Sequence, residues 1–142
     1  MNVKVKYHDP ELEHIRIETN GDWIDLRASE RVFMNAGEYR IIPLGISMKL
    51  PDGYEAHLAP RSSTYKRWGI LMVNSVGVID NSYSGDDDVW GFAALATRAT
   101  VIEKNDRIAQ FRIMKKMDPV TFEEVDHLNS ENRGGFGSTG RN

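Results

Sequence analysis

The sequence contains no cysteine, which excludes disulfide bonds and thiolate metal sites. It has no apolar run near the roughly 18 residues that a membrane-spanning helix needs, and its first residues lack the apolar core of a signal peptide. It also lacks a basic surplus: 18 Lys and Arg against 21 Asp and Glu give a net charge of −3, which argues against nucleic acid as a partner. The sequence therefore predicts a soluble cytoplasmic protein that binds neither membranes nor nucleic acid, with a small anionic ligand still allowed.

Motifs of several enzyme classes are missing as well. The four histidines are scattered and form no His-Glu-x-x-His pattern, so a zinc site has no support. No Gly-x-Ser-x-Gly elbow is present, which leaves serine hydrolase chemistry unsupported. An EF-hand counted from Asp80 fails, because Gly91 stands where the loop needs a bidentate glutamate.

Most of the chain has the pattern of short β-strands. Residues 44–50 alternate apolar with polar or small side chains, a period of two that indicates a half-buried strand. Similar segments recur between turn-forming Gly, Pro, Asn and Asp residues. We expect strands over residues 3–7, 15–18, 39–42, 44–50, 54–58, 70–73, 89–95, 100–102, 109–113 and 120–125. This pattern predicts one all-β domain (a sandwich, jelly roll or barrel) over residues 1–128, followed by a tail of different composition over 129–142.

Residues 61–69 depart from the strand pattern. Ser62 and Ser63 suit a helix N-cap and Gly69 suits a helix end, so one or two helical turns are expected. The free N–H groups of such a turn, with Arg61 and the two hydroxyls beside them, could bind an anion. The segment could equally be a connecting turn whose serines only cap it.

Residues 77–85 form a second candidate site. Asp80 directly follows an apolar strand and Tyr83 comes three residues later, an arrangement that suits a general base beside an aromatic wall. The alternative is a turn aspartate that bonds its own backbone.

The C-terminal stretch from Asn132 to Gly140 is rich in glycine and cannot form a helix or a packed strand. It is either a frayed terminus or an arm that orders over a ligand. Its backbone N–H groups and the hydroxyls of Ser138 and Thr139 would suit phosphates. Together with residues 61–69 and Asp80, this arm would indicate a phosphorylated ligand.

Five stretches, in this order, resemble the motifs of the trimeric dUTP diphosphatases (dUTPases). They are Asp25-Leu26-Arg27-Ala28, Pro60-Arg61-Ser62-Ser63, residues 74–85, Asp106-Arg107-Ile108-Ala109-Gln110 and residues 134–140. Each stretch alone is weak, but five in order at this spacing span the chain from about residue 23 to 140.

The resemblance implies a jelly-roll-like subunit with one short helix and a flexible C-terminal arm. It implies a homotrimer whose active sites are shared between subunits. It also implies Mg²⁺-assisted hydrolysis of dUTP to dUMP and pyrophosphate, which limits uracil in DNA and supplies dUMP for thymidylate synthesis.

The resemblance also implies a role for each matching residue. Asp80 would orient and deprotonate the attacking water, Tyr83 would stack under the deoxyribose, and Asp25 would contact Mg²⁺ through water. The other substrate-binding residues fall into three sets: Arg61, Ser62, Ser63 and Gln110 for the phosphates; Asn74, Gly77, Val78 and Ile79 for uracil; and Arg133, Phe136, Gly137, Ser138 and Thr139 in the closing arm.

Two stretches depart from the family pattern. The first motif usually has small residues and then an aromatic residue or leucine before Asp-Leu, and Asp22-Trp23-Ile24 stands there instead. In the fifth motif, Glu131 stands where an arginine is usual, and Arg133 follows two residues later. The sequence leaves open whether Arg133 takes that place or the arm binds with hydroxyls and amides alone.

Two alternatives differ in function. A dCTP deaminase shares the Arg-Ser-Ser motif, but that family carries a catalytic glutamate after the third motif, and residues 89–98 contain none. A nucleotide-gated protein that docks a regulatory partner is the other alternative, and the sequence offers nothing for or against it.

Overall fold

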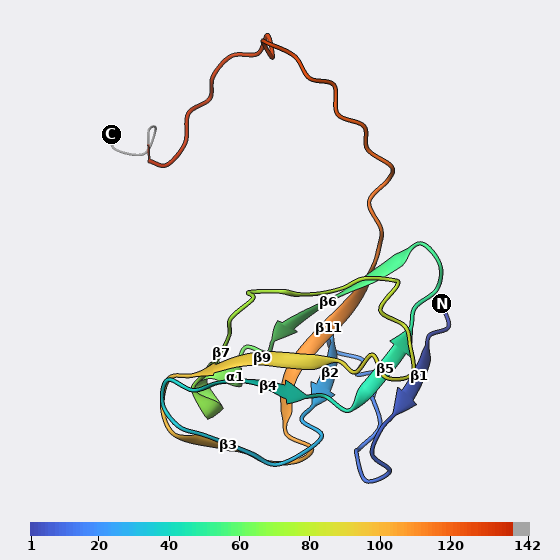
Figure 1. The fold of residues 1–142 in the computed structure, drawn as a ribbon, viewed down its shortest axis with the longest axis vertical. Helices are drawn as coiled ribbons and strands as arrows, with labels where there is room; N and C mark the ends of the chain where they lie inside the picture. The colour runs from blue at the N-terminus through green and yellow to red at the C-terminus, as the bar shows by residue number, and fades with distance from the viewer. Residues whose placement is uncertain (138–142) are drawn as a thin grey trace.

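The computed structural model describes residues 1–137, which form an all-β body, one short helix and a C-terminal extension (Figure 1). The strands are β1 (Lys4–Tyr7), β2 (Ile24–Arg27), β3 (Val32–Met34), β4 (Tyr39–Pro43), β5 (Ile46–Lys49), β6 (Tyr54–Pro60), β7 (Ile70–Met72), β8 (Gly77–Ile79), β9 (Gly91–Ala96), β10 (Thr100–Ile102) and β11 (Arg107–Lys115), and the helix is α1 (Thr64–Trp68). No helix in this part of the chain is long and apolar enough to cross a membrane.

The strands form four antiparallel sheets around one core. A four-stranded sheet has the order β2-β11-β6-β8, and a three-stranded sheet has the order β4-β9-β7. The pairs β1-β5 and β10-β3 complete the body. The prediction of an all-β, jelly-roll-like body with one short helix is therefore confirmed.

The core joins the main sheets through large apolar side chains. Trp90 and Phe111 meet edge to face, with ring centroids 5.2 Å apart and an interplanar angle of 84°. Strand β9 alternates buried and half-buried residues, so that Phe92 and Ala94 point into the core. Burial of such side chains is the main source of stability in a domain of this size.

The helix α1 confirms the expectation for residues 61–69, except for its cap. Gly69 ends the helix in the left-handed conformation (φ 64°), and the Arg98 side chain occupies the space that a Cβ there would need. Nη2 of Arg98 also donates to the carbonyl of Arg67 (2.9 Å). Ser63 stands at the N-cap position, but its side chain makes no capping hydrogen bond.

Several strand predictions need correction. Residues 15–18 are not a strand: Ile15 packs against the core, but the segment has no partner strand within residues 1–137. The segment 44–50 forms a strand only from Ile46, because Gly45 takes a left-handed φ of 68° and a Cβ there would lie 2.5 Å from Cβ of Ser29. Strands β2 and β3 were not expected from the sequence, whereas β8 is the apolar strand expected directly before Asp80.

The chain beyond β11 runs away from the body (Figure 1). The strand expected at residues 120–125 is absent in the computed structure, and Phe122 is 91% exposed. The predicted domain boundary at residue 128 stays a prediction.

Candidate active site

Neighbouring strands bring residues of separate motifs into one line. Asp25 of β2 lies opposite Gln110 of β11, and Gln110 lies opposite Ala59 of β6. The next residues, Leu26 and Ala109, are buried, whereas Asp25 and Gln110 are partly exposed. Strand alternation therefore puts the first-motif and fourth-motif polar groups on one face of the sheet.

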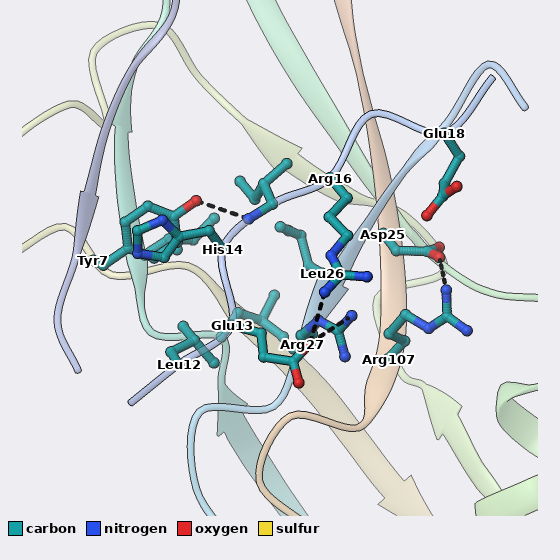
Figure 2. Close-up of a pocket in the computed structure, with 13 residues that line it drawn as sticks. Tyr7, Leu12, Glu13, His14, Arg16, Glu18, Asp25, Leu26, Arg27 and Arg107 are labelled. Atoms are coloured by element: carbon teal, nitrogen blue, oxygen red, sulfur yellow. Dashed lines mark hydrogen bonds and ion pairs between the residues drawn. The ribbon is translucent and has the colours of Figure 1, made fainter. Parts of the chain in front are cut away.

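Arg61 directly follows β6, and its side chain reaches Asp25. Its Nε lies 2.9 Å from Oδ1 of Asp25, and its Nη1 donates to the carbonyl of Arg107 (3.2 Å). Nη1 of Arg107 donates to Oδ2 of Asp25 (3.3 Å), as Figure 2 shows. One carboxylate is thus shared by two guanidinium groups, an arrangement that holds Arg61 at the edge of the sheet.

Thr64 fixes the turn that carries Arg61. The backbone N–H of Arg61 donates to Oγ1 of Thr64 (2.8 Å), and the Thr64 hydroxyl donates to the carbonyl of Ile108 (2.8 Å). Thr64 is fully buried, so these bonds are shielded from water. Sequence reasoning missed this residue, because a threonine at the start of a helical turn resembles an ordinary cap.

A pocket of about 340 Å³ lies beside these groups. Four of the predicted residues line it: Asp25, Arg61, Ser62 and Gln110. Its remaining wall comes from Glu18, Gly21, Asp22 and Trp23. Nε2 of Gln110 donates to the carbonyl of Pro60 (3.1 Å), which keeps that side chain at the pocket. The partly buried guanidinium of Arg61 and the exposed hydroxyl of Ser62 suit phosphate oxygens.

A second, smaller hollow lies between the N-terminal segment and β2 (Figure 2). The rings of Tyr7 and His14 stack there with centroids 4.2 Å apart, and Glu13 pairs with Arg27 at 3.2 Å. Its volume of about 20 Å³ has room for roughly one water molecule. These contacts stabilise β2 behind Asp25 and leave no space for a nucleotide.

The third-motif stretch forms a hairpin at the edge of the four-stranded sheet. Val78 of β8 lies opposite His57 of β6, and the preceding turn holds Ser75 at a φ of 61°. Gly77 lies against Leu58, whose Cβ would be 3.0 Å from a Cβ at position 77. A larger residue at 77 would push the hairpin off β6. Asn74 lies in the turn, where its carbonyl accepts from the N–H of Val76 (2.6 Å).

Asp80 and Tyr83 follow this hairpin. The Ser82 hydroxyl donates to the carboxylate of Asp80, and this bond, with smaller contributions from nearby backbone N–H groups, holds the pKa of Asp80 below its ordinary value of 3.8. The hydroxyl of Tyr83 donates to the carbonyl of Val89 (2.9 Å), which fixes a ring that is 40% exposed. The Asp80 carbonyl also accepts from the N–H of Tyr83 (3.0 Å), which places Asp80 in a turn, and its role as a general base stays a prediction.

The two halves of the predicted site lie at opposite ends of β6. Ile79, just before Asp80, pairs with Ala56, whereas Arg61 follows the other end of the strand. Five residues at about 3.3 Å each put roughly 17 Å between these ends. A single chain therefore does not bring Asp80 to the Arg61 pocket.

The arm residues that the structure describes, up to Gly137, do not complete the site within this chain. Arg133, Phe136 and Gly137 are exposed and lie in the extension, which is remote from the body in Figure 1. Ser138 and Thr139 lie outside the described residues.

Comparison with known proteins decides the family. The family model described as dUTPase matches residues 13–140. The chain belongs to the dUTPase family. It is 56% identical over 140 residues to the SPbeta prophage-derived deoxyuridine 5′-triphosphate nucleotidohydrolase YosS of Bacillus subtilis (strain 168), with 99% of each chain covered. It is 37% identical over 131 residues to the deoxyuridine 5′-triphosphate nucleotidohydrolase of Fusobacterium nucleatum, covering 89% of this chain and 88% of that protein.

Solved dUTPases share the fold of this family member at lower identity. A Staphylococcus bacteriophage 80alpha dUTPase with dUpNHpp superimposes with a TM-score of 0.80 at 20% identity, covering 99% of both chains. The dUTPase from Streptococcus mutans gives a TM-score of 0.73 at 24% identity, covering 85% of this chain and 100% of that one. The match over nearly the full length supports the jelly-roll-like fold.

Proposed function

We propose that the protein hydrolyses dUTP to dUMP and pyrophosphate, with each active site assembled from several subunits. The observation that carries the proposal is the line of Asp25 and Gln110 beside Arg61, which gathers three of the five dUTPase-like motifs at one pocket. We expect the enzyme to act in the cytoplasm, where it would limit uracil in DNA and supply dUMP for thymidylate synthesis.

Asp80 would act as the general base. Its lowered pKa keeps the carboxylate ionised near neutral pH, so it can accept a proton from water. The resulting hydroxide would attack the α-phosphorus, and the bond to the pyrophosphate oxygen would break. Arg61, Ser62, Ser63 and Gln110 of another subunit would hold the phosphate oxygens.

The hairpin would read the nucleoside. Residues Asn74, Gly77, Val78 and Ile79 would bind uracil through main-chain groups, which β8 can offer because it is the edge strand of its sheet. The ring of Tyr83, held by Val89, would lie against the deoxyribose and leave no room for a 2′-hydroxyl.

In a homotrimer, Asp80 of one subunit would lie beside the Arg61 pocket of another. Two surfaces support association between copies. The segment 120–125 exposes Val120, Phe122 and Val125. An apolar groove of about 430 Å³ lies between β1, residues 15–24 and β11. Since β1 pairs only with β5 within the described chain, its other edge is available to a strand from a second copy.

The residues at the pocket fit Mg²⁺ held mainly by the substrate. Within residues 1–137 no group of three His, Asp or Glu side chains could hold a metal ion by itself. Mg²⁺ prefers phosphate oxygens, water and one or two carboxylates, and the partly exposed Asp25 offers such an oxygen through a bound water. When bound, Mg²⁺ would neutralise charge on the triphosphate.

The arm would close over the bound nucleotide. Arg133 would neutralise phosphate charge, Phe136 would cover the base or sugar, and Gly137 would let the chain wrap closely. Ser138 and Thr139, beyond the described residues, are proposed as phosphate donors on sequence grounds.

The deciding experiment measures pyrophosphate release from dUTP, dCTP, dTTP and UTP with Mg²⁺. Rapid release from dUTP alone is expected. Ammonia production from dCTP would instead identify a deaminase, and no release from dUTP would overturn the proposal.

A further inference from the structure

Trp23 stands at the nucleotide pocket without a role in the reaction as described so far. It belongs to the stretch Asp22-Trp23-Ile24, in which Ile24 packs against the core and Trp23 lines the same pocket as Asp25 and Arg61. A half-buried indole at a pocket that is otherwise lined by polar and charged residues and one glycine needs a physical reason.

Arg112 holds this indole. Gln110 lies opposite Asp25 and Phe111 opposite Ile24, so Arg112 is the β11 residue nearest Trp23 in the same register. The guanidinium carbon of Arg112 lies 5.8 Å from the centroid of the Trp23 ring, within cation–π range. Among the described residues 1–137, no carboxylate pairs with Arg112, and its guanidinium lies over the Trp23 ring instead.

We propose that Trp23 is a further substrate-binding residue, an aromatic wall of the triphosphate pocket, and that Arg112 is its positioning residue. This inference rests on the proposed dUTP hydrolysis. Trp23 would act in two ways: its ring excludes water from one side of the phosphates, and its indole N–H is a donor for a phosphate oxygen. Excluding water strengthens the attraction between Arg61 and the phosphates, because charge interactions grow as the local dielectric falls.

The positive charge of Arg112 adds to this effect. Arg61 and Arg107 both lie on the carboxylate of Asp25, which offsets part of their charge. Arg112 has no such partner among the described residues, so it would raise the local potential for a polyanion in a protein of net charge −3.

The test combines kinetics with fluorescence. Trp68 and Trp90 are 9% and 1% exposed, so Trp23 is the tryptophan placed to report on the pocket. In the wild-type protein, adding dUpNHpp with Mg²⁺ should change tryptophan emission, and Trp23→Phe should abolish that change. Trp23→Phe should keep KM for dUTP within about threefold, whereas Trp23→Ala should raise it about tenfold with a smaller fall in kcat, because binding and not chemistry is lost.

Arg112→Met tests the positioning role, and Arg40→Met is its matched control. Losing an exposed cation–π contact should raise KM about two- to fivefold at Arg112. Arg40 lies on β4 and pairs with Glu38 at 3.0 Å, away from the pocket, so its substitution should leave KM unchanged. Melting temperatures of all variants identify any that fail to fold.

The outcomes separate the two proposals. If the wild type releases pyrophosphate from dUTP but Trp23→Ala keeps the wild-type KM, and the emission change persists in Trp23→Phe, the role of Trp23 is wrong while the function stands. If the wild type does not hydrolyse dUTP, the function itself is wrong.

Discussion

The carboxylate of Asp25 joins two arginines, with Oδ1 2.9 Å from Nε of Arg61 and Oδ2 3.3 Å from Nη1 of Arg107. Arg107 also accepts from Arg61 through its carbonyl, so three residues of three motifs form a closed ring. In this ring the carboxylate of Asp25 offsets part of the positive charge of Arg61. A bound triphosphate with Mg²⁺ would compete for both partners of this ion pair.

Asp25→Asn should therefore raise the Mg²⁺ concentration needed for half-maximal turnover while leaving the fold intact. The amide keeps the shape of the side chain but loses the charge that favours a hydrated cation. The measurement is kcat as a function of Mg²⁺ concentration at saturating dUTP. Glu103→Gln, which removes an exposed partner of Arg31, is the control and should behave as wild type. An unchanged Mg²⁺ dependence in Asp25→Asn would remove Asp25 from the metal site.

Asp80→Asn should lower kcat by about 10²–10⁴-fold and largely keep dUTP binding, because the amide cannot accept the proton of water. Steady-state turnover and binding of dUpNHpp would be compared in the same variant. Turnover near the wild-type rate would show that Asp80 is not the base.

The hydrogen bond from Ser82 to Asp80 predicts how activity should depend on pH. A carboxylate works as a base above its pKa, so activity should fall only on the acid side, below the ordinary aspartate range. Ser82→Ala removes the largest cause of the lowered pKa, so the acid limb of kcat/KM should move to higher pH. A profile with the same acid limb in both proteins would contradict this role for Ser82.

Two substitutions at Tyr83 separate its ring from its hydroxyl. Tyr83→Ala removes the ring that would pack against the deoxyribose, so affinity for dUTP should fall. The ratio of kcat/KM for dUTP to kcat/KM for UTP should also fall. Tyr83→Phe loses only the bond to Val89 and should keep most of that ratio. Both ratios follow from parallel assays with the two nucleotides. A wild-type preference for dUTP over UTP in Tyr83→Ala would show that another group excludes the 2′-hydroxyl.

Sequence patterns predicted the fold class well because most long strands carry a clear period. Strand β10 was predicted with its exact bounds, and β4, β6 and β9 within a few residues. The short strand β2 gave no period of its own, although it carries Asp25, whereas the apolar residues before Asp80 indicated β8. Residues 120–125 have the composition of a strand, but a strand needs a neighbour, and the described chain provides none for them.

The candidate site, like the fold, could be predicted from the sequence only in part. Motif order identified Asp25, Arg61 and Gln110, but only the register of β2, β11 and β6 shows that they face one pocket. The separation of Asp80 from that pocket could not be read from the sequence, because it depends on which end of β6 each residue follows. Contacts between residues distant in sequence, such as Trp23 with Arg112, also leave no periodic signal.

The ion pair between Asp9 and Lys104 gives a prediction for thermal stability. Nζ of Lys104 lies 2.6 Å from Oδ2 of Asp9, and this bond lowers the pKa of Asp9 and raises that of Lys104. The lowered pKa of Asp9 contributes stability above its unfolded pKa, which is lost as pH falls. The raised pKa of Lys104 contributes stability below its unfolded pKa, which is lost as pH rises through the folded one. Asp9→Asn should lower Tm at neutral pH and reduce the fall of Tm on acidification, and thermal melts across pH would show it.

The arm is the last part of the proposed site to be tested. Ordering a glycine-rich segment costs about 1–2 kcal/mol per residue in backbone entropy, so closure should require the ligand. Truncation after Ser130 leaves every strand in place, and it should give a folded protein of unchanged oligomeric state that has lost most of its turnover. Phe136→Ala should show a milder loss, since one ring is removed from an arm that still closes. Limited proteolysis of the full chain should cut the arm readily without nucleotide and slowly with dUpNHpp and Mg²⁺. Equal cleavage in both states, with full activity after truncation, would mean that this segment is a frayed terminus without a catalytic role.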